Sequence, residues 1–528
     1  MLLAKLFIAD LESLIMVTAL VLIIAMAIAA SSALPQFVFI ETAINVLPES
    51  FTPTIAKELP PLYCAASTYR VFFLPSYTRT YTSAEMIGKG TKYLIWFAHE
   101  HVPFRMPEFH AIASIFGVTV KFLEQPKGEP YAIVELPSED DARKLASRSV
   151  LIRSITELWA HAGEIDDVCD KVKEFPATFW DAYGGADQSF KFSVEVFGKR
   201  KVPREVKVEK IEKFDFLPLN GPINLENPDH IYHLIEYYGI VPNCIPEKPH
   251  AVFFGRWICD GQRFLKSHLA LKTRKFIANT SMDPTLSVIM ANMARVQKNH
   301  LILDPFVGSG SLLVPAAFFG AYVLGTDLDY MLLHGKAKPS RCNEKQRADD
   351  ESVRANLQQY GCEERFVEVV VSDASLPLWR AEMRFDAIIT DPPYGIREAT
   401  ERIGTRKTYG IPGHLAAQHI PSKVAYCLRD VMCDLLNFSA HHLCLSGRLV
   451  FWMPIYNEDF SESSLPRHPC LKLITYTEQS LSKHSSRLLI TMEKTSEPDD
   501  TSCAVMSSTA DKFRDRYFTG AKGKDMKS

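Results

Sequence analysis

Short, almost entirely apolar runs alternate with segments of helical periodicity in the second half of the chain. Between residues 275 and 494 these runs are LILD, YVLGTD, VEVVVSD, DAIITD and GRLVFWM. Strands that are apolar on both faces and separated by helices are typical of a parallel sheet with helices on both sides. We therefore predict an α/β domain with a doubly wound sheet over residues 275–494.

A different pattern precedes this domain. From residue 92 to about residue 157 the chain alternates strand, helix, strand, helix. The helical segment MPEFHAIASIFG ends at Gly117, and SEDDARKLASRS begins with a serine N-cap and an acidic first turn. This alternation predicts a small α+β, ferredoxin-like region.

A second small block follows from residue 190 to residue 238. We expect a strand at FKFSVEVFG, a basic stretch, a strand at PINLE and a helix at PDHIYHLIEYYG. The next segment is rich in proline, which interrupts both helices and sheets, so we expect a linker over residues 242–274. The first two blocks together then occupy residues 86–241, and a polar tail occupies residues 495–528.

The N-terminal segment is strongly apolar. No charged residue occurs between residues 13 and 40, a length sufficient to cross a bilayer as a helix. Three interpretations compete: a membrane anchor or uncleaved signal, a buried apolar helix, and an extension from an upstream start codon. Residues 48–92 are rich in proline, serine, threonine and tyrosine and are expected to form a linker.

Composition narrows the possible functions. The 528 residues suggest roughly three domains. The 59 lysines and arginines against 62 acidic residues give a net charge of −3, so nucleic-acid binding requires a local basic patch. The 11 cysteines never form a CxxC pair, which indicates free thiols in a reducing compartment such as the cytoplasm, with neither a disulfide framework nor a four-cysteine zinc site. His99-Glu100-His101 lacks the HExxH spacing and a further ligand set, so we expect no metal site.

Three acidic residues end successive predicted strands. Asp304 precedes a turn through Gly308 and Gly310 into a helix, where glycine lets the backbone approach a bound cofactor. Asp327 ends the next strand and is placed to accept the two hydroxyls of a ribose. Asp373 ends a third strand and is placed to bind the amino edge of an adenine. A single such aspartate is more often a helix N-cap, but three in succession over a glycine turn favour a nucleotide-like cofactor.

The motif DPPYG directly follows the strand DAIIT. Pro392 and Pro393 fix the backbone and remove two donors, so the Asp391 carboxylate and the Pro392 carbonyl can accept the two N–H groups of an exocyclic amine. Holding both protons frees the nitrogen lone pair for attack on a sulfonium methyl. Tyr394 offers a face on which an extruded base can stack. We expect these four residues to form the catalytic site.

Two groups of basic residues are candidates for RNA contact. Lys199, Arg200, Lys201 and Arg204 form the densest basic run, which a solvated hairpin would also explain. Arg397, Arg402 and Arg406 follow the DPPYG motif and are expected to line the entrance for the target nucleotide.

These motifs carry a family resemblance. DPFVGSG followed by DPPYG resembles the amino-methyltransferases that use S-adenosyl-L-methionine. FGRWICDGQR, NTSMDPTLSVIMAN, FGAYVLGTDLDY, VRANLQQYG and FDAIITDPPYGIRE together resemble the catalytic subunit of the eukaryotic tRNA guanine-10 N2-methyltransferase. The block NLENPDHIYHLIE is similar to the THUMP domain, an RNA-binding module. The resemblance extends over residues 92–494, with a weaker echo in KFRDRYF.

The resemblance implies a Rossmann-like class I methyltransferase sheet preceded by a ferredoxin-like and THUMP region that binds tRNA. It implies that Thr280, Ser281 and Met282 border the methionine end of the cofactor, above Asp304, Gly308 and Gly310. It also implies a small zinc-binding activator subunit that covers an apolar edge of the catalytic domain, for which the strand LVFWMP is a candidate.

Residues 1–85 have no counterpart in this family, which favours an upstream-start extension over a membrane anchor. Three alternatives to the tRNA guanine-10 enzyme remain at this point. They are an amino-methyltransferase for another guanine in RNA or for DNA adenine, a non-catalytic tRNA-binding protein, and a membrane-tethered enzyme. The THUMP-like block argues against DNA, and the intact Asp391 and glycine turn argue against loss of catalysis.

Overall fold

The computed structural model describes residues 90–198, 202–241, 244–341, 344–405, 421–507, 511 and 513–522. All described residues belong to one compact unit, which spans residues 88–528. The apolar segment at residues 13–40 therefore lies outside the described residues. Within the described ranges, no helix combines the length and apolar character needed to cross a membrane.

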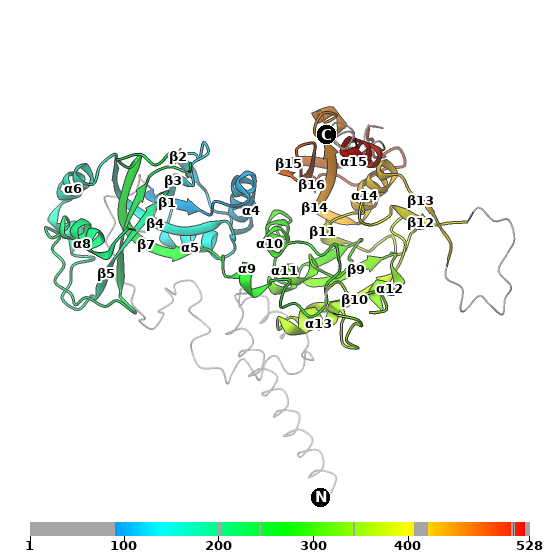
Figure 1. The fold of residues 1–528 in the computed structure, drawn as a ribbon, viewed down its shortest axis with the longest axis horizontal. Helices are drawn as coiled ribbons and strands as arrows, with labels where there is room; N and C mark the ends of the chain where they lie inside the picture. Colours follow the sequence, from blue (N-terminus) through cyan, green and yellow to red (C-terminus); the bar gives the residue numbers. More distant parts are fainter. Residues whose placement is uncertain are drawn as a thin grey trace, which may run out of the picture. The chain divides into compact units, whose positions relative to one another are not determined.

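The first half of the described chain forms a seven-stranded sheet in the order β2-β3-β1-β4-β7-β6-β5 (Figure 1). Its strands are β1 (Thr91–Phe97), β2 (Lys121–Glu124), β3 (Tyr131–Leu136), β4 (Ile152–Ala162), β5 (Phe190–Phe197), β6 (His230–Tyr237) and β7 (Ala251–Asp260). Its helices are α4 (Arg105–Phe116), α5 (Glu139–Ala146), α6 (Ile165–Lys173), α7 (Ala177–Trp180) and α8 (Arg204–Glu212). The predicted ends of α4 and α5 are confirmed, because Gly117 is left-handed at φ 63° and Ser138 accepts a hydrogen bond from Asp141 N–H.

Three sequence expectations in this half are wrong. The expected helix at PDHIYHLIEYYG is strand β6, because its apolar residues alternate between two cores: Tyr232 and Leu234 face one, Ile235 and Tyr237 the other. PINLE contributes only an isolated bridge from Ile223. The expected linker contains β7, which pairs with both β4 and β6 in the middle of the sheet.

The second half forms another seven-stranded sheet in the order β10-β9-β8-β11-β14-β16-β15. Its strands are β8 (Leu301–Asp304), β9 (Tyr322–Asp327), β10 (Phe366–Val371), β11 (Phe385–Thr390), β14 (Leu443–Tyr456), β15 (Leu471–Ser480) and β16 (Ser485–Lys494). The first five in spatial order are parallel, and β16 pairs antiparallel with both β14 and β15; the parallel part confirms the Rossmann-like fold. The hairpin β12 (Glu401–Ile403) and β13 (Lys423–Ala425) stands apart from this sheet.

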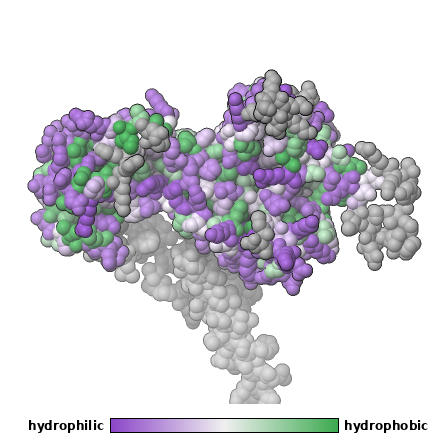
Figure 2. Space-filling view, viewed as in Figure 1, coloured by the Kyte–Doolittle hydropathy of each residue, from purple (hydrophilic) through white to green (hydrophobic). Residues whose placement is uncertain are grey.

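Helices cover both faces of this second sheet, as strands that are apolar on both sides require. They are α9 (Leu265–His268), α10 (Pro284–Met293), α11 (Leu313–Phe318), α12 (Tyr330–Leu333), α13 (Val353–Gln359) and α14 (Leu428–His442). Ile302 and Trp452 belong to the core shared with α10 and α11, whereas Leu303 and Phe451 belong to the core shared with α14. Polar residues dominate the visible surface of the described part, with apolar residues in separate small areas (Figure 2).

The expected polar tail contains a packed helix, α15 (Phe513–Lys522). Phe513 is only 3% exposed and belongs to the same core as α14. The expectation of a tail over residues 495–528 is therefore wrong for this segment, because one buried aromatic ring attaches the helix to the second sheet.

Candidate functional site

The glycine turn after β8 brings the first two acidic strand ends together. Gly308 has φ 50°, and its N–H donates to the Asp327 carboxylate at 2.8 Å. Gly310 has φ 76°. A Cβ at Gly310 would lie 2.6 Å from Val353 Cγ1, whereas a Cβ at Gly308 would meet no atom within 4 Å. Gly310 thus serves helix packing, and Gly308 borders open space next to Asp327.

The two glycines make a matched pair of substitutions. We expect Gly310→Ala to lower the free energy of unfolding by about 2–3 kcal/mol, from left-handed strain plus the contact with Val353. Gly308→Ala should lower the free energy of unfolding by only about 1 kcal/mol. It should weaken cofactor binding more than Gly310→Ala does, because the alanine methyl group enters the open space. Urea unfolding and calorimetric titration of S-adenosyl-L-methionine measure the two effects, and equal effects of both variants on binding would contradict this assignment.

Asp304 is buried below the turn. Its carboxylate accepts hydrogen bonds from the Thr390 hydroxyl at 2.7 Å and from Phe306 N–H at 3.0 Å. Burial raises the pKa of Asp304 to about 7, and the nearby Asp327 and Asp391 carboxylates add to the rise. Asp304 therefore links the glycine turn to the end of β11, from which the DPPYG motif starts.

The segment before α10 closes another side of the site. The Ser281 hydroxyl is hydrogen-bonded to that of Ser309 in the glycine turn at 2.6 Å. Thr280 donates to Glu398, which follows the DPPYG motif. Met282 is buried, and its sulfur lies 3.6 Å from an Arg487 nitrogen. The structure thus places Thr280, Ser281 and Met282 between the glycine turn and the DPPYG segment.

The DPPYG motif places Asp391 and Tyr394 in direct contact at the end of β11. The Tyr394 hydroxyl donates to one Asp391 oxygen, and Arg487 Nη1 lies 3.4 Å from the other. Pro392 is buried and Pro393 half-buried, so the turn is held by packing as well as by its fixed φ. Burial raises the pKa of Asp391 to about 6, and the Arg487 cation opposes that rise.

Arg487 is a site residue that the sequence analysis missed. It lies on β16, far along the chain from the motif, and its guanidinium stacks 4.0 Å from the centroid of the Trp452 ring. An arginine inside the apolar run SSRLLITM was the available signal, since a charge in a buried strand needs a partner.

The pKa of Asp391 predicts the pH dependence of methyl transfer. If the carboxylate form accepts the amine hydrogens, kcat/KM is constant above about pH 7 and falls about tenfold per pH unit below pH 6, as Asp391 protonates. Arg487→Gln removes the cation that opposes the rise, so the acidic limb should move to higher pH. Single-turnover rates measured from pH 5 to 8.5 check this, and a rate that stays constant down to pH 5 would contradict it.

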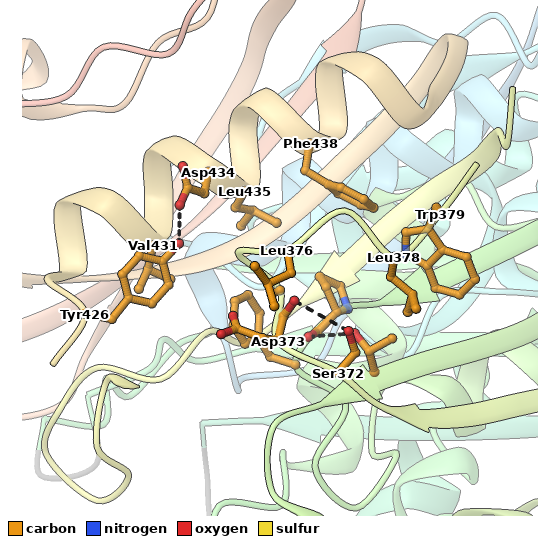
Figure 3. Close-up of a pocket in the computed structure, with 14 residues that line it drawn as sticks. Ser372, Asp373, Leu376, Leu378, Trp379, Tyr426, Val431, Asp434, Leu435 and Phe438 are labelled. Atoms are coloured by element: carbon orange, nitrogen blue, oxygen red, sulfur yellow. Dashed lines mark hydrogen bonds between the residues drawn. The ribbon is translucent and has the colours of Figure 1, made fainter. Parts of the chain in front are cut away.

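A cavity next to Asp373 lies between the β10 end and α14 (Figure 3). Asp373 is buried and accepts hydrogen bonds from Ser375 N–H, at 2.8 Å, and from Ile403 N–H. The other lining residues are largely apolar or aromatic and come from several loops and from α14: Pro305, Phe306, Leu376, Leu378, Trp379, Tyr426, Val431, Leu435 and Phe438. Two carboxylates also line it, Asp373 and Asp434, and the Asp434 carboxylate accepts a hydrogen bond from the Tyr426 hydroxyl. A largely apolar slot with a carboxylate at its wall suits a flat heterocycle with an amino group.

Only some of the basic residues expected to contact RNA lie among the residues that the structure describes. Arg204 begins α8 on the first sheet and is exposed. Arg397 and Arg402 are exposed beside the DPPYG segment, with Arg402 placed 5.4 Å from the centroid of the Tyr426 ring. Lys199, Arg200, Lys201 and Arg406 lie outside the described residues.

Two family models match the chain. The model described as the Tmrp11 THUMP N-terminal domain matches residues 91–263, and the RMKL-like methyltransferase domain matches residues 272–426. The first match includes β7, in agreement with the place of that strand in the first sheet.

Several relatives are similar over nearly their whole length. The protein named tRNA (guanine(10)-N(2))-methyltransferase TRMT11 of Rattus norvegicus is 45% identical over 444 residues, which are 82% of this chain and 96% of that protein. The Homo sapiens protein of that name is 44% identical, with 81% and 95% covered. The Dictyostelium discoideum protein is 35% identical, with 78% and 83% covered. Among solved structures, TrmN from Thermus thermophilus has a TM-score of 0.36 at 16% identity, covering 76% of this chain and 99% of TrmN.

Proposed function

The chain belongs to the family of the tRNA (guanine(10)-N(2))-methyltransferases, and from this premise we propose how its site performs the reaction. The enzyme transfers the methyl group of S-adenosyl-L-methionine to the exocyclic N2 of guanosine-10 in tRNA. The observation that carries the mechanism is the position of Asp391 and Tyr394 beside the glycine turn, with Asp304 linking the two through Thr390.

The residues present suit S-adenosyl-L-methionine, which supplies an activated methyl group on a sulfonium. The open space beside Gly308, next to the Asp327 carboxylate, supports placing its sugar there, where Asp327 would accept the ribose hydroxyls. The largely apolar lining of the cavity beside Asp373 supports placing the adenine there, where this carboxylate would accept a hydrogen bond from the adenine amino group. Thr280, Ser281 and Met282 would border the methionine end.

Asp391 and the Pro392 carbonyl hold the target amine. An arylamine nitrogen is a weak nucleophile because its lone pair is delocalised into the ring. Two acceptors fixed at the two N–H groups favour pyramidal geometry at nitrogen and direct the lone pair toward the methyl group. The Tyr394 ring stacks on the extruded base. Its hydroxyl, which donates to an Asp391 oxygen in this structure, releases that oxygen so that it can accept a hydrogen bond from the amine.

Transfer RNA is held by the first sheet and by exposed cations around the site. Arg204 on α8 and Arg397 and Arg402 near the DPPYG segment are exposed. We assign phosphate contacts to them, together with Lys199, Arg200, Lys201 and Arg406. The free thiols of the described residues suit a reducing compartment, and we place the enzyme in the cytoplasm.

A small zinc-binding activator subunit is the proposed protein partner. The strand LVFWMP, a candidate for that interface from the sequence, lies in β14 between β11 and β16 and is buried, so it is unavailable. The edge strand β10 is a better surface, because Val367, Val370 and Val371 are 48%, 37% and 38% exposed. An apolar edge strand has unpaired backbone groups that a partner strand can extend.

The test is methyl transfer from labelled S-adenosyl-L-methionine to unmodified tRNA, with the full chain co-expressed with the activator. We expect N2-methylguanosine at position 10 by nucleoside mapping. A product at another guanine would favour the alternative amino-methyltransferase, and cofactor binding without transfer to any RNA would favour a non-catalytic tRNA-binding protein. Val370→Lys should abolish co-purification of the activator, whereas Leu473→Lys, on the opposite edge strand β15, should not.

A further inference from the structure

The C-terminal helix α15 carries two arginines with different surroundings. Arg516 stacks on Tyr456 at 4.6 Å from the ring centroid and forms ion pairs with Glu458 and Asp459 at 3.3 and 3.0 Å. Arg514 is exposed and has no carboxylate or other hydrogen-bond partner among the described residues. Arg516 therefore helps to attach the helix, whereas Arg514 is not needed for that attachment.

Arg514 lies beside the catalytic motif. A Cβ built on Gly395, the residue after Tyr394, would be 3.3 Å from Arg514 Cδ and 3.9 Å from its Nε. The same Cβ would be 3.6 Å from the Thr400 hydroxyl oxygen. Gly395 has φ 78°, so the chain turns here without a side chain and leaves room for the arginine. The buried Phe513 keeps the start of the helix in this position.

The proposed reaction needs a cation at this place. A guanosine that leaves its stack to reach Asp391 carries its own phosphates to the edge of the site. Arg487 already faces Asp391 and the Trp452 ring, so it is committed to the catalytic carboxylate. Arg514 carries a free guanidinium beside Gly395, the residue that follows the stacking tyrosine. Guanidinium groups bind phosphate oxygens in pairs.

We propose that Arg514 binds a backbone phosphate of the target nucleotide or its immediate neighbour, and so makes α15 part of the RNA-binding surface. This inference rests on the proposed function, because it presumes an RNA guanosine at Asp391. The contact is to the sugar–phosphate backbone, so it positions the nucleotide and does not select the base.

The experiment compares Arg514→Lys, Arg514→Gln and Arg514→Glu in the full chain with its activator. Unmodified tRNA is the substrate, and kcat, KM and S-adenosyl-L-methionine affinity are measured from 50 to 200 mM salt. For Arg514→Gln we expect KM for tRNA to rise about tenfold, with kcat within about threefold and cofactor affinity unchanged. Arg514→Glu should raise KM for tRNA about 100-fold, and Arg514→Lys should leave KM for tRNA close to the wild-type value.

The salt series separates a phosphate contact from a structural role. Loss of one phosphate contact lowers the slope of log affinity against log salt by about 0.7–0.9. Arg467→Gln is the matched control, because Arg467 is also an exposed arginine but lies away from the site. It precedes Leu471, which pairs with Lys494, and Lys494 is at the opposite end of β16 from Arg487. It should leave KM and slope unchanged.

Two results would overturn the inference. One is a KM within twofold of wild type for both Arg514→Gln and Arg514→Glu. The other is a parallel loss of kcat, cofactor binding and thermal stability in all three variants, with no change of salt slope. Either result with an active wild-type enzyme rejects the role of Arg514 alone, whereas a wild-type chain that does not methylate tRNA rejects the proposed function itself.

Discussion

Asp391→Ala is expected to reduce kcat for methyl transfer by about 1000-fold while tRNA affinity stays within about threefold. The substitution removes an acceptor that acts on the amine during the reaction, in a buried site where such interactions are strong. It leaves Arg397, Arg402 and the first sheet intact, so the RNA contacts persist. Single-turnover transfer and filter binding of tRNA measure the two quantities.

The control for Asp391 is Asp430→Ala, which removes a half-exposed carboxylate at the start of α14 whose ion-pair contact is to the neighbouring Arg429. It should change kcat by less than twofold. A loss of tRNA binding equal to the loss of transfer in Asp391→Ala would contradict the assigned role, because it would indicate that the carboxylate holds the structure of the site.

Glu108→Ala is expected to have the largest effect on stability. Glu108 on α4 is fully buried, and its carboxylate accepts from the Ser149 hydroxyl at 2.6 Å, Val150 N–H at 3.2 Å and the Asn292 amide at 2.9 Å. Asn292 lies on α10 of the catalytic half. Removing the carboxylate leaves these buried donors unsatisfied, at about 1–3 kcal/mol each, so we expect about 4 kcal/mol of destabilisation.

Because this network joins the first sheet to α10, the variant should also raise KM for tRNA more than it weakens cofactor binding. Urea unfolding, tRNA kinetics and cofactor titration together measure this. Asp140→Ala on α5 is the control, since Asp140 forms an exposed ion pair with Lys144 and should cost below about 1 kcal/mol. Equal stability of the two variants would show that Glu108 does not connect the two halves.

The order of strands and acids in the catalytic half was predictable because each signal is local. An apolar run ending in Asp304, Asp327 or Asp373 is a buried strand with a polar carboxyl end, and parallel strands bring such ends to one edge. The signals failed where the apolar residues of a segment lie on both of its faces. In HIYHLIEY the spacing suits a helix and a strand buried on both faces alike, and only the pairing of β6 with β5 and β7 decides between them.

The sequence by itself therefore determined the reaction class, the glycine turn and the DPPYG motif, because these residues are contiguous and their chemistry follows from their types. The tertiary structure decided what depends on distant contacts. It brought Arg487 to Asp391, joined Glu108 to Asn292, buried the strand at LVFWMP and placed Arg514 beside Gly395. Such pairs form between residues separated by many positions, where periodicity and spacing carry no information about which side chains meet.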